Sequence, residues 1–226
     1  MRLHRFYINE DIGSRDELRI VDESLIHQVR DVFRLGATDS IIAFCDDGLD
    51  YIFEIELVTK KELKLKKIKS EKNFIPERKV VLLIALIKKD NFELVLEKAT
   101  EIGVTHFVPV VTERTLSKNI NFERAQKIIR EASEQCGRGD IPTLGDVASL
   151  DSVLKEYSNL IAFDISGKVF ESQKSDVEIL IGPEGGWSDK EIDLFKEKKV
   201  NLLKLGDTTL RAETAAIVAS AKIILG

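Results

Sequence analysis

Short apolar runs separated by turn signals fill the first 70 or so residues and predict strands. Asp46-Asp47-Gly48 is a hairpin signal between two of them, and one helix is expected over 24–34, where apolar residues recur on one side. The expected strands are 2–8, 17–21, 40–45, 51–59 and 62–69. This pattern indicates a small β-barrel domain over 1–72, ending near Asn73-Phe74-Ile75-Pro76, where proline interrupts it.

From Lys79 onward the pattern changes to alternating strands and helices. Strands are expected at 79–87, 105–111, near Leu144, and at 159–164, 178–182 and 200–205, with helices at 91–102, 121–136, 149–157, 189–198 and 212–225. Such alternation predicts an α/β domain over 77–226 whose parallel sheet is covered on both faces.

The segment from Gly182 to Gly186 cannot continue the buried strand before it. Gly185 and Gly186 allow positive φ and expose backbone amides, while Pro183 stiffens the entry. Ser188 and Glu191 form a capping box that predicts a helix start. The loop is either a cradle for a small ligand or a tight strand-to-helix turn that binds nothing.

A second strand, loop and helix follow in the same order, with Gly206 in the loop. The final helix is rich in Ala and Ile and is expected to be buried nearly all round, in a core or against a partner subunit. Arg211 and Glu213 stand at its start, either as site residues or as a plain cap, since an acidic group is favoured in the first helical turn. The two loops are expected to face one place.

Composition places the chain among globular proteins. The 226 residues can form one large domain or two small ones, and 43% hydrophobic content is ample for a core. No apolar run is long enough to span a bilayer and no signal peptide is visible, so a cytoplasmic location is the default expectation. Cys45 and Cys136 lack C-x-x-C spacing and the three histidines lack metal-ligand spacing, so no disulfide framework or metal site is expected.

A net charge of −5 argues against nucleic-acid binding until the distribution of charge is considered. Arg2 and Arg5 crowd the first strand and are candidates for RNA contacts. Seven lysines between Lys60 and Lys72 are better explained as a solvated edge strand whose charges block edge-to-edge pairing.

Several motifs carry a resemblance to a known family. IGPEGGWSDKEI (181–192) and LGDTTLRAETAA (205–216) are similar to the paired signature loops of the RsmE-type 16S ribosomal RNA uridine-N3 methyltransferases of the SPOUT superfamily. Upstream, KKDNFE (88–93), LEKATEIGV (96–104), VPVVTERT (108–115) and EASEQCGRGDIP (131–142) resemble the same family in the same order. The match covers the C-terminal two-thirds and, more loosely, MRLHRFYI and HQVRDVFRL near the start.

The resemblance implies a PUA-like RNA-binding barrel followed by a SPOUT domain whose C-terminal helix is threaded into a trefoil knot. It implies transfer of a methyl group from S-adenosylmethionine (SAM) to N3 of a uridine in 16S ribosomal RNA of the small ribosomal subunit, without a metal and by a homodimer. The cofactor would contact Ile181, Gly182, Pro183, Gly185, Gly186, Leu205, Gly206, Leu210, Thr214 and Ala215.

For the reacting centre, Arg211 is the hypothesised stabiliser of charge on the uracil, since N3 must lose its proton. Glu184 and Glu213 are candidate bases, and either could instead hold a loop by accepting amide hydrogens. Further RNA contacts are implied for Glu113, Arg114, Gln135 and Arg138.

The chain departs from the family between Gly206 and Leu210, where Asp207-Thr208-Thr209 replaces a proline, an arginine and an aliphatic residue. A cation is lost and an anion is gained. Two alternatives therefore stay open: a SPOUT methyltransferase acting on another RNA such as transfer RNA, and a catalytically inactive RNA-binding or assembly protein.

Overall fold

The computed structural model describes residues 3–116, 119–171 and 175–226. The chain divides into two compact units. The first contains the chain up to Ile75 together with Ser133–Ile141, and the second contains Pro76–Ala132 and Pro142–Gly226. None of the helices in the described part of the chain is long and apolar enough to cross a membrane.

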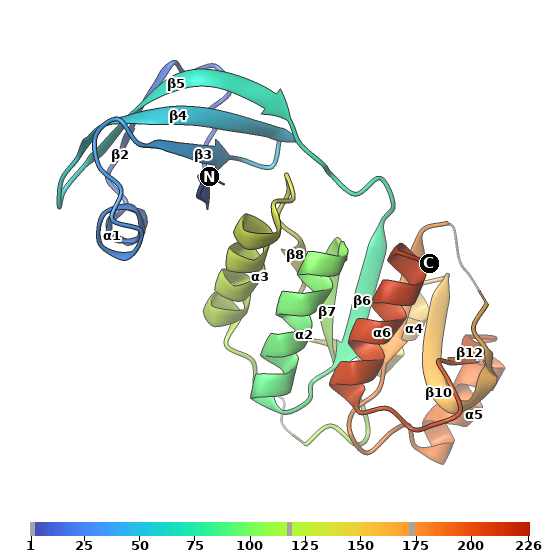
Figure 1. Cartoon of the computed structure of the whole chain (residues 1–226). Coiled ribbons are helices and arrows are strands. Elements are labelled where there is room, and N and C mark those ends of the chain that lie inside the picture. Colours follow the sequence, from blue (N-terminus) through green and yellow to red (C-terminus); the bar gives the residue numbers. More distant parts are fainter. Residues whose placement is uncertain (1–2, 117–118, 172–174) are drawn as a thin grey trace. The chain divides into compact units, whose positions relative to one another are not determined.

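The first unit is built on a five-stranded sheet in the order β1-β3-β4-β5-β2 (Figure 1). β1 is parallel to β3, and the other neighbours are antiparallel. The strands are β1 (Arg5–Tyr7), β2 (Glu17–Ile20), β3 (Ser40–Phe44), β4 (Leu49–Val58) and β5 (Leu63–Lys72). Phe6, Ile41, Phe53 and Leu65 belong to a closed apolar core on one face of this sheet.

The expectation that the lysine-rich strand is an edge strand is wrong for Leu63–Lys66, where β5 lies between β4 and β2, whereas the rest of β5 pairs with β4 alone among the described strands. Strand β2 pairs along Leu63–Lys66, with Glu17 opposite Lys66 and Arg19 opposite Lys64. On the other side Glu54 of β4 is also opposite Lys66. Cross-strand carboxylates offset the lysine charge on this face, because opposite charges on facing strands attract.

The expected single helix over 24–34 has two parts. Helix α1 (Glu23–His27) begins at Asp22, whose carboxylate accepts hydrogen bonds from the amides of Ser24 and Leu25 over 2.8 and 3.2 Å. The π-helix η1 (Gln28–Val32) follows directly. The amide of Phe33 bonds to the carbonyl of Gln28, five residues earlier, over 2.9 Å, which is the spacing that defines a π turn.

The segment Ser133–Ile141 joins the first unit through polar contacts. Arg5 donates from Nη2 to the carbonyl of Arg138 over 3.0 Å, and the amide of Tyr7 donates to Glu134 over 2.9 Å. Asn73 donates to the carbonyl of Gly137 over 3.1 Å. The predicted bounds 77–226 placed this segment in the second domain, because such contacts leave no periodic signal in the sequence.

The second unit contains a parallel seven-stranded sheet, which confirms the α/β prediction. Its order is β12-β10-β11-β6-β7-β8, and β9 also pairs with β7. The strands are β6 (Val80–Ala85), β7 (His106–Val111), β8 (Thr143–Leu144), β9 (Ala148–Ser149), β10 (Leu160–Val169), β11 (Val177–Ile181) and β12 (Asn201–Lys204). Every residue of the central strand β6 is buried, as expected for a parallel strand covered on both faces.

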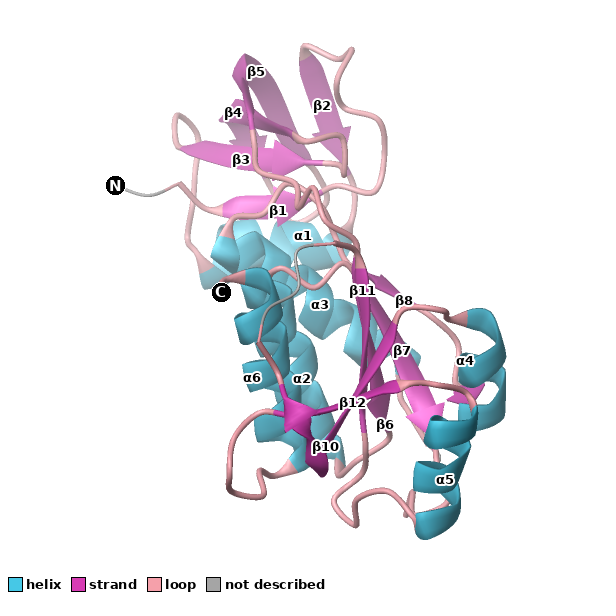
Figure 2. Cartoon of the chain, turned by 90° about the vertical axis from the view of Figure 1, so that its right-hand side faces the viewer, coloured by secondary structure: helices cyan, strands magenta, loops and turns pink. Residues whose placement is uncertain are grey.

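Helices α2 and α6 cover one face of this sheet, and α4 and α5 cover the other (Figure 2). The helices are α2 (Lys89–Ile102), α3 (Phe122–Cys136), α4 (Leu150–Glu156), α5 (Asp189–Glu197) and α6 (Ala212–Ile224). In this chain α6 is buried on one side, through Ala216, Ala219 and Ile223, while Ile217 and Val218 remain half-buried. The expectation of burial nearly all round is therefore not met within a single chain.

Strand β10 pairs with β12 in two stretches. Leu203 is the partner of Phe163 in the first stretch and of Lys168 in the second. A Cβ at Gly167 would lie 2.6 Å from the backbone of Leu203, so this close approach requires glycine. Residues 164–167 therefore bulge out between two stretches of parallel pairing with β12, and Asp164 and Ile165 in this bulge line the cavity described next.

Candidate functional site

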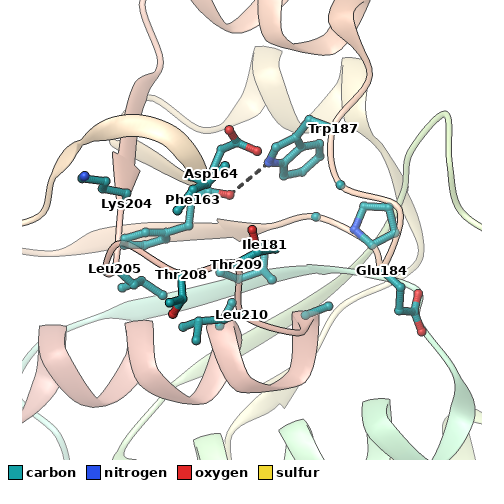
Figure 3. A pocket seen from close by; sticks show the side chains of 17 residues that line it. Phe163, Asp164, Ile181, Glu184, Trp187, Lys204, Leu205, Thr208, Thr209 and Leu210 are labelled. Carbon is teal, nitrogen blue, oxygen red and sulfur yellow. Dashed lines mark hydrogen bonds between the residues drawn. The ribbon is translucent and has the colours of Figure 1, made fainter.

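A cavity of about 140 Å³ opens at the carboxyl ends of β11 and β12 and beside the middle of β10 (Figure 3). Ligands of open parallel sheets bind at this edge, where loops and helix starts converge. Both predicted glycine loops reach the cavity, so the expectation that they face one place is met. Its lining consists of Phe163, Asp164, Ile165, Ile181, Gly182, Pro183, Glu184, Gly186, Trp187, Lys204, Leu205, Gly206, Thr208, Thr209, Leu210, Ala212 and Ala215.

The first loop is held in shape by Trp187. Its indole Nε1 donates to the carbonyl of Phe163 over 3.1 Å, and its ring packs edge-on against Phe195 with the ring centroids 5.0 Å apart. A Cβ at Gly182 would lie 2.9 Å from the indole ring, so only glycine fits there. Gly186 has φ of +66°, a conformation that other residues rarely adopt.

The predicted capping box at the start of α5 is confirmed. Glu191 accepts the amide of Ser188 over 2.8 Å through one oxygen and the amide of Glu113 over 2.9 Å through the other. The hydroxyl of Ser188 donates to the carboxylate of Glu113 over 2.8 Å. Glu113, predicted to contact RNA, therefore ties the loop after β7 to the first glycine loop.

Two more side chains hold the first loop. Arg114 donates from Nη1 to the carbonyl of Gly185 over 2.7 Å, and Glu184 accepts the amide of Lys88 over 2.9 Å. Glu184 is exposed and lines the cavity, whereas Gly185 does not line it. The loop is thus connected to the loops that follow β6 and β7.

The second loop carries the Asp207-Thr208-Thr209 departure from the family pattern. Lys204 donates to Asp207 over 2.8 Å, and this ion pair lowers the pKa of Asp207. Lys204, Thr208 and Thr209 line the cavity. Lys204, the cation that precedes the second loop, is therefore already paired with the anion that this chain has gained.

Arg211 and Glu213 differ in their surroundings. Arg211 is exposed at the N-cap of α6 and makes no side-chain capping bond. Glu213 is 8% exposed, and within the described residues its Oε2 has no hydrogen-bond partner. Neither residue lines the cavity, although Ala212 between them does.

Eight of the ten predicted cofactor residues line the cavity. Gly185 and Thr214 do not. The side of the cavity formed by the middle of β10, where Asp164 accepts two hydrogen bonds from Ser166, was not predicted from the sequence. Trp187 was also not predicted, although this residue lies inside the first motif and its large ring beside two glycines was an available signal.

The structure gives two of the predicted RNA contacts an interior position. Arg5 is 9% exposed and Arg138 is 4% exposed, and they form ion pairs with Asp50 and Asp140. Burial leaves little of either guanidinium for RNA: Arg5 joins Ser133–Ile141 to the sheet of the first unit, and the guanidinium of Arg138 pairs with Asp140 within that segment. Gln135 is exposed on the same segment, and Arg2 lies outside the described residues.

Among the residues that the structure describes, no three His, Cys, Asp or Glu side chains are grouped so that they could hold a metal ion.

Comparison with known proteins gives consistent matches. The family model of an RNA methyltransferase domain matches residues 75–224. Ribosomal RNA small subunit methyltransferase E of Rickettsia conorii is 28% identical over 235 aligned residues, covering 100% of this chain and 96% of that protein. The protein of the same name from Synechocystis is 32% identical, covering 88% of this chain and 70% of its own length.

A solved structure from Legionella pneumophila, described as a methyltransferase in complex with the bound cofactor SAM, superposes with a TM-score of 0.89. It is 31% identical and covers 98% of this chain and 96% of its own. The similarity therefore extends over both units of the chain.

Proposed function

Because the chain belongs to the RsmE-type family of RNA methyltransferases, we propose that it methylates ribosomal RNA of the small subunit at N3 of a uridine, using SAM. The observation that carries the proposal is the cavity formed by both family signature loops at the carboxyl edge of the sheet. When bound, SAM supplies the methyl group: its carbon bonds to N3, the electron pair of the broken carbon–sulfur bond stays on sulfur, and the N3 proton is lost.

The cavity lining suits an adenosine. Ile181, Leu205 and Leu210 offer apolar contacts for a flat ring, and the glycine loops offer backbone amides and carbonyls for its edge. Asp164 offers a carboxylate, which commonly accepts the hydroxyls of a ribose, and its two bonds from Ser166 fix its orientation. These residues would hold the nucleoside part of the cofactor.

Arg211 is proposed to stabilise the charge that develops on the uracil when N3 loses its proton. Its guanidinium is exposed and makes no capping bond, so it is available to a substrate. Of the two candidate bases, Glu184 is favoured, because it is exposed and lines the cavity. Glu213 is buried away from the lining and fits a role inside the fold better.

The knot that the family resemblance implies is proposed for this chain as well. The two-stretch pairing of β10 with β12, with Leu203 a partner in both stretches, supports it. So does the place of α6, whose first turn contributes Ala212 and Ala215 to the cavity. Such threading would keep the two signature loops together without a ligand.

We assign the PUA-like RNA-binding role to the first unit, over the predicted boundaries 1–72, with the catalytic domain at 77–226. The five-stranded sheet and its closed core support a small β domain of this kind. Its RNA contacts would come from exposed groups such as Gln135 rather than from Arg5 or Arg138.

We also propose that the protein forms a homodimer and is located in the cytoplasm. The half-buried face of α6, with Ile217, Val218 and Ile224, continues to Leu225, which is 72% exposed. A second copy of the chain would cover this apolar surface, since exposed apolar patches commonly mark interfaces.

The test is transfer of labelled methyl from SAM to small ribosomal subunits that lack uridine-N3 methylation, followed by nucleoside analysis. Free 16S RNA and transfer RNA are run in parallel. Label recovered as 3-methyluridine from subunits or 16S RNA supports the proposal. Label in transfer RNA would favour a different substrate, and cofactor binding without label in any RNA would favour an inactive RNA-binding protein.

A further inference from the structure

A second and larger cavity, of about 490 Å³, lies in the same unit beside the start of α2. The loop after β6, the first turn of α2 and the segment leading into α3 form its walls. Glu184 lines both this cavity and the first one. In Figure 3 the Glu184 side chain extends away from Trp187, out of the cluster that holds the first loop.

The walls combine apolar and polar surface in a way that suits a flat heterocycle. Leu86, Ile87, Phe92 and Ala125 are all buried and offer apolar surface. At the rim are Lys88 and the amide of Asn121, whose Oδ1 accepts the amide of Arg124 over 3.0 Å at the start of α3. Nucleotide-modifying enzymes read a base that has left the helical stack through such contacts.

The rim also carries available positive charge. Glu93 is held by Arg124 through two contacts of 2.6 Å, and Lys89 lies 3.7 Å from Glu93. Lys88 is exposed and, within the described part of the chain, forms no ion pair, while its amide is bonded to Glu184. Its ammonium is therefore free to pair with an anionic ligand.

We propose that this second cavity receives the acceptor uridine nucleotide, flipped out of the RNA. Lys88 pairs with the negative charge of the phosphate group of this nucleotide. The inference rests on the proposed function and deepens it, since no other observation assigns a place to the methyl acceptor. With the cofactor in the first cavity and the uridine in the second, Glu184 would lie between the methyl donor and the methyl acceptor, because it lines both cavities. A group that accepts the N3 proton is needed at this position. The competing occupant is the amino-acid end of the cofactor, which also carries charge.

The first experiment is photocrosslinking of the full chain. The methylated position is mapped by the reverse-transcription stop that 3-methyluridine causes, and a small-subunit RNA is then made with 4-thiouridine at that position. After irradiation, an adduct on peptides covering 86–93 or 119–125 is expected. Adducts confined to other peptides overturn the proposal, whereas absence of 3-methyluridine at the mapping step overturns the proposed function itself.

The second experiment distinguishes whether the second cavity binds the acceptor uridine or the cofactor. Lys88→Glu keeps the backbone amide that bonds Glu184 and reverses only an exposed charge. We expect kcat/KM for the RNA to fall by about tenfold or more, with the Kd for SAM changed by less than about twofold. Lys190→Glu changes a lysine on α5 that is also exposed and lies outside both cavities, so it is the matched control and should leave both values unchanged. A Kd for SAM weakened about tenfold in Lys88→Glu would assign the cavity to the cofactor and overturn the proposal.

Discussion

The indole of Trp187 donates a hydrogen bond to the carbonyl of Phe163 over 3.1 Å. This bond joins the first signature loop to the middle of β10, where the first stretch of pairing with β12 ends. It also places the indole ring against Gly182, where no side chain would fit. The shape of the cavity therefore depends on one aromatic residue that is fixed from three sides, by Phe163, Phe195 and Gly182.

Gly182→Ala is predicted to destabilise the protein and weaken cofactor binding. The new methyl group would lie 2.9 Å from the indole, which cannot move without losing its bond to Phe163. Overpacking of this kind costs about 1–3 kcal/mol of unfolding free energy. Denaturant unfolding and calorimetric titration with SAM measure the two effects.

The control for this substitution is Gly206→Ala in the other loop. A Cβ at Gly206 meets no atom within 4 Å, and its φ is not in the left-handed region. The free energy of unfolding should stay within about 0.5 kcal/mol of the original value. Equal destabilisation by both substitutions would show that the contact with Trp187 is not the cause.

Arg211→Ala should lower methyl transfer by about a hundredfold or more, because removal of one charge-stabilising donor has effects of that order. Stability should change little, since Arg211 is exposed and makes no side-chain capping bond. Single-turnover methylation and thermal unfolding provide the two measurements. Arg211→Lys, which retains the charge but not the planar guanidinium, should recover part of the rate. Methylation by Arg211→Ala close to that of the unmodified protein would remove Arg211 from the reacting centre.

The parts of the site that could be predicted from sequence are those that depend only on residues close together in the chain. The Ser188 and Glu191 capping box needs only four consecutive residues, and its geometry is confirmed. Alternating apolar runs likewise predicted the parallel sheet, because each strand and helix carries its own periodicity. The two glycine loops could be predicted because each of them begins where an apolar strand run ends.

The parts that could not be predicted depend on contacts between distant segments. Asp164 lines the cavity because β10 lies beside β11 and β12, and nothing in its own neighbourhood signals this. Arg5 looked available for RNA because its partners Asp50 and Arg138 are far away in sequence. The strand order that places β2 outside β5 is a property of the whole sheet as well.

Arg5→Ala is predicted to destabilise the first unit strongly. Arg5 is 9% exposed and joins Asp50 to the carbonyl of Arg138. Removing one partner leaves a carboxylate in a mostly buried position without its counter-charge, which costs about 3–5 kcal/mol of unfolding free energy. Arg15→Ala is the control, because the pair of Arg15 with Glu10 is about half exposed on both sides and should contribute less than about 1 kcal/mol. Chemical denaturation of both variants tests the difference, and a small loss in Arg5→Ala would mean that Ser133–Ile141 is held by its other contacts.

His106 is predicted to make stability depend on pH near neutrality. Burial, together with the nearby charge of Lys79, lowers the pKa of His106 below its ordinary value of 6.5, although Glu156 acts in the opposite direction. The unfolded chain therefore binds a proton more readily than the folded protein, so the free energy of unfolding decreases as pH falls through 6.5 towards the folded pKa. His106→Gln removes this titration and should flatten the profile between pH 7 and the folded pKa, relative to the unmodified protein. Unfolding curves at a series of pH values measure the difference, and nuclear magnetic resonance of the ring protons gives the folded pKa directly. A resonance of His106 that titrates above 6.5, or parallel profiles for the two proteins, would show that burial does not govern this ring.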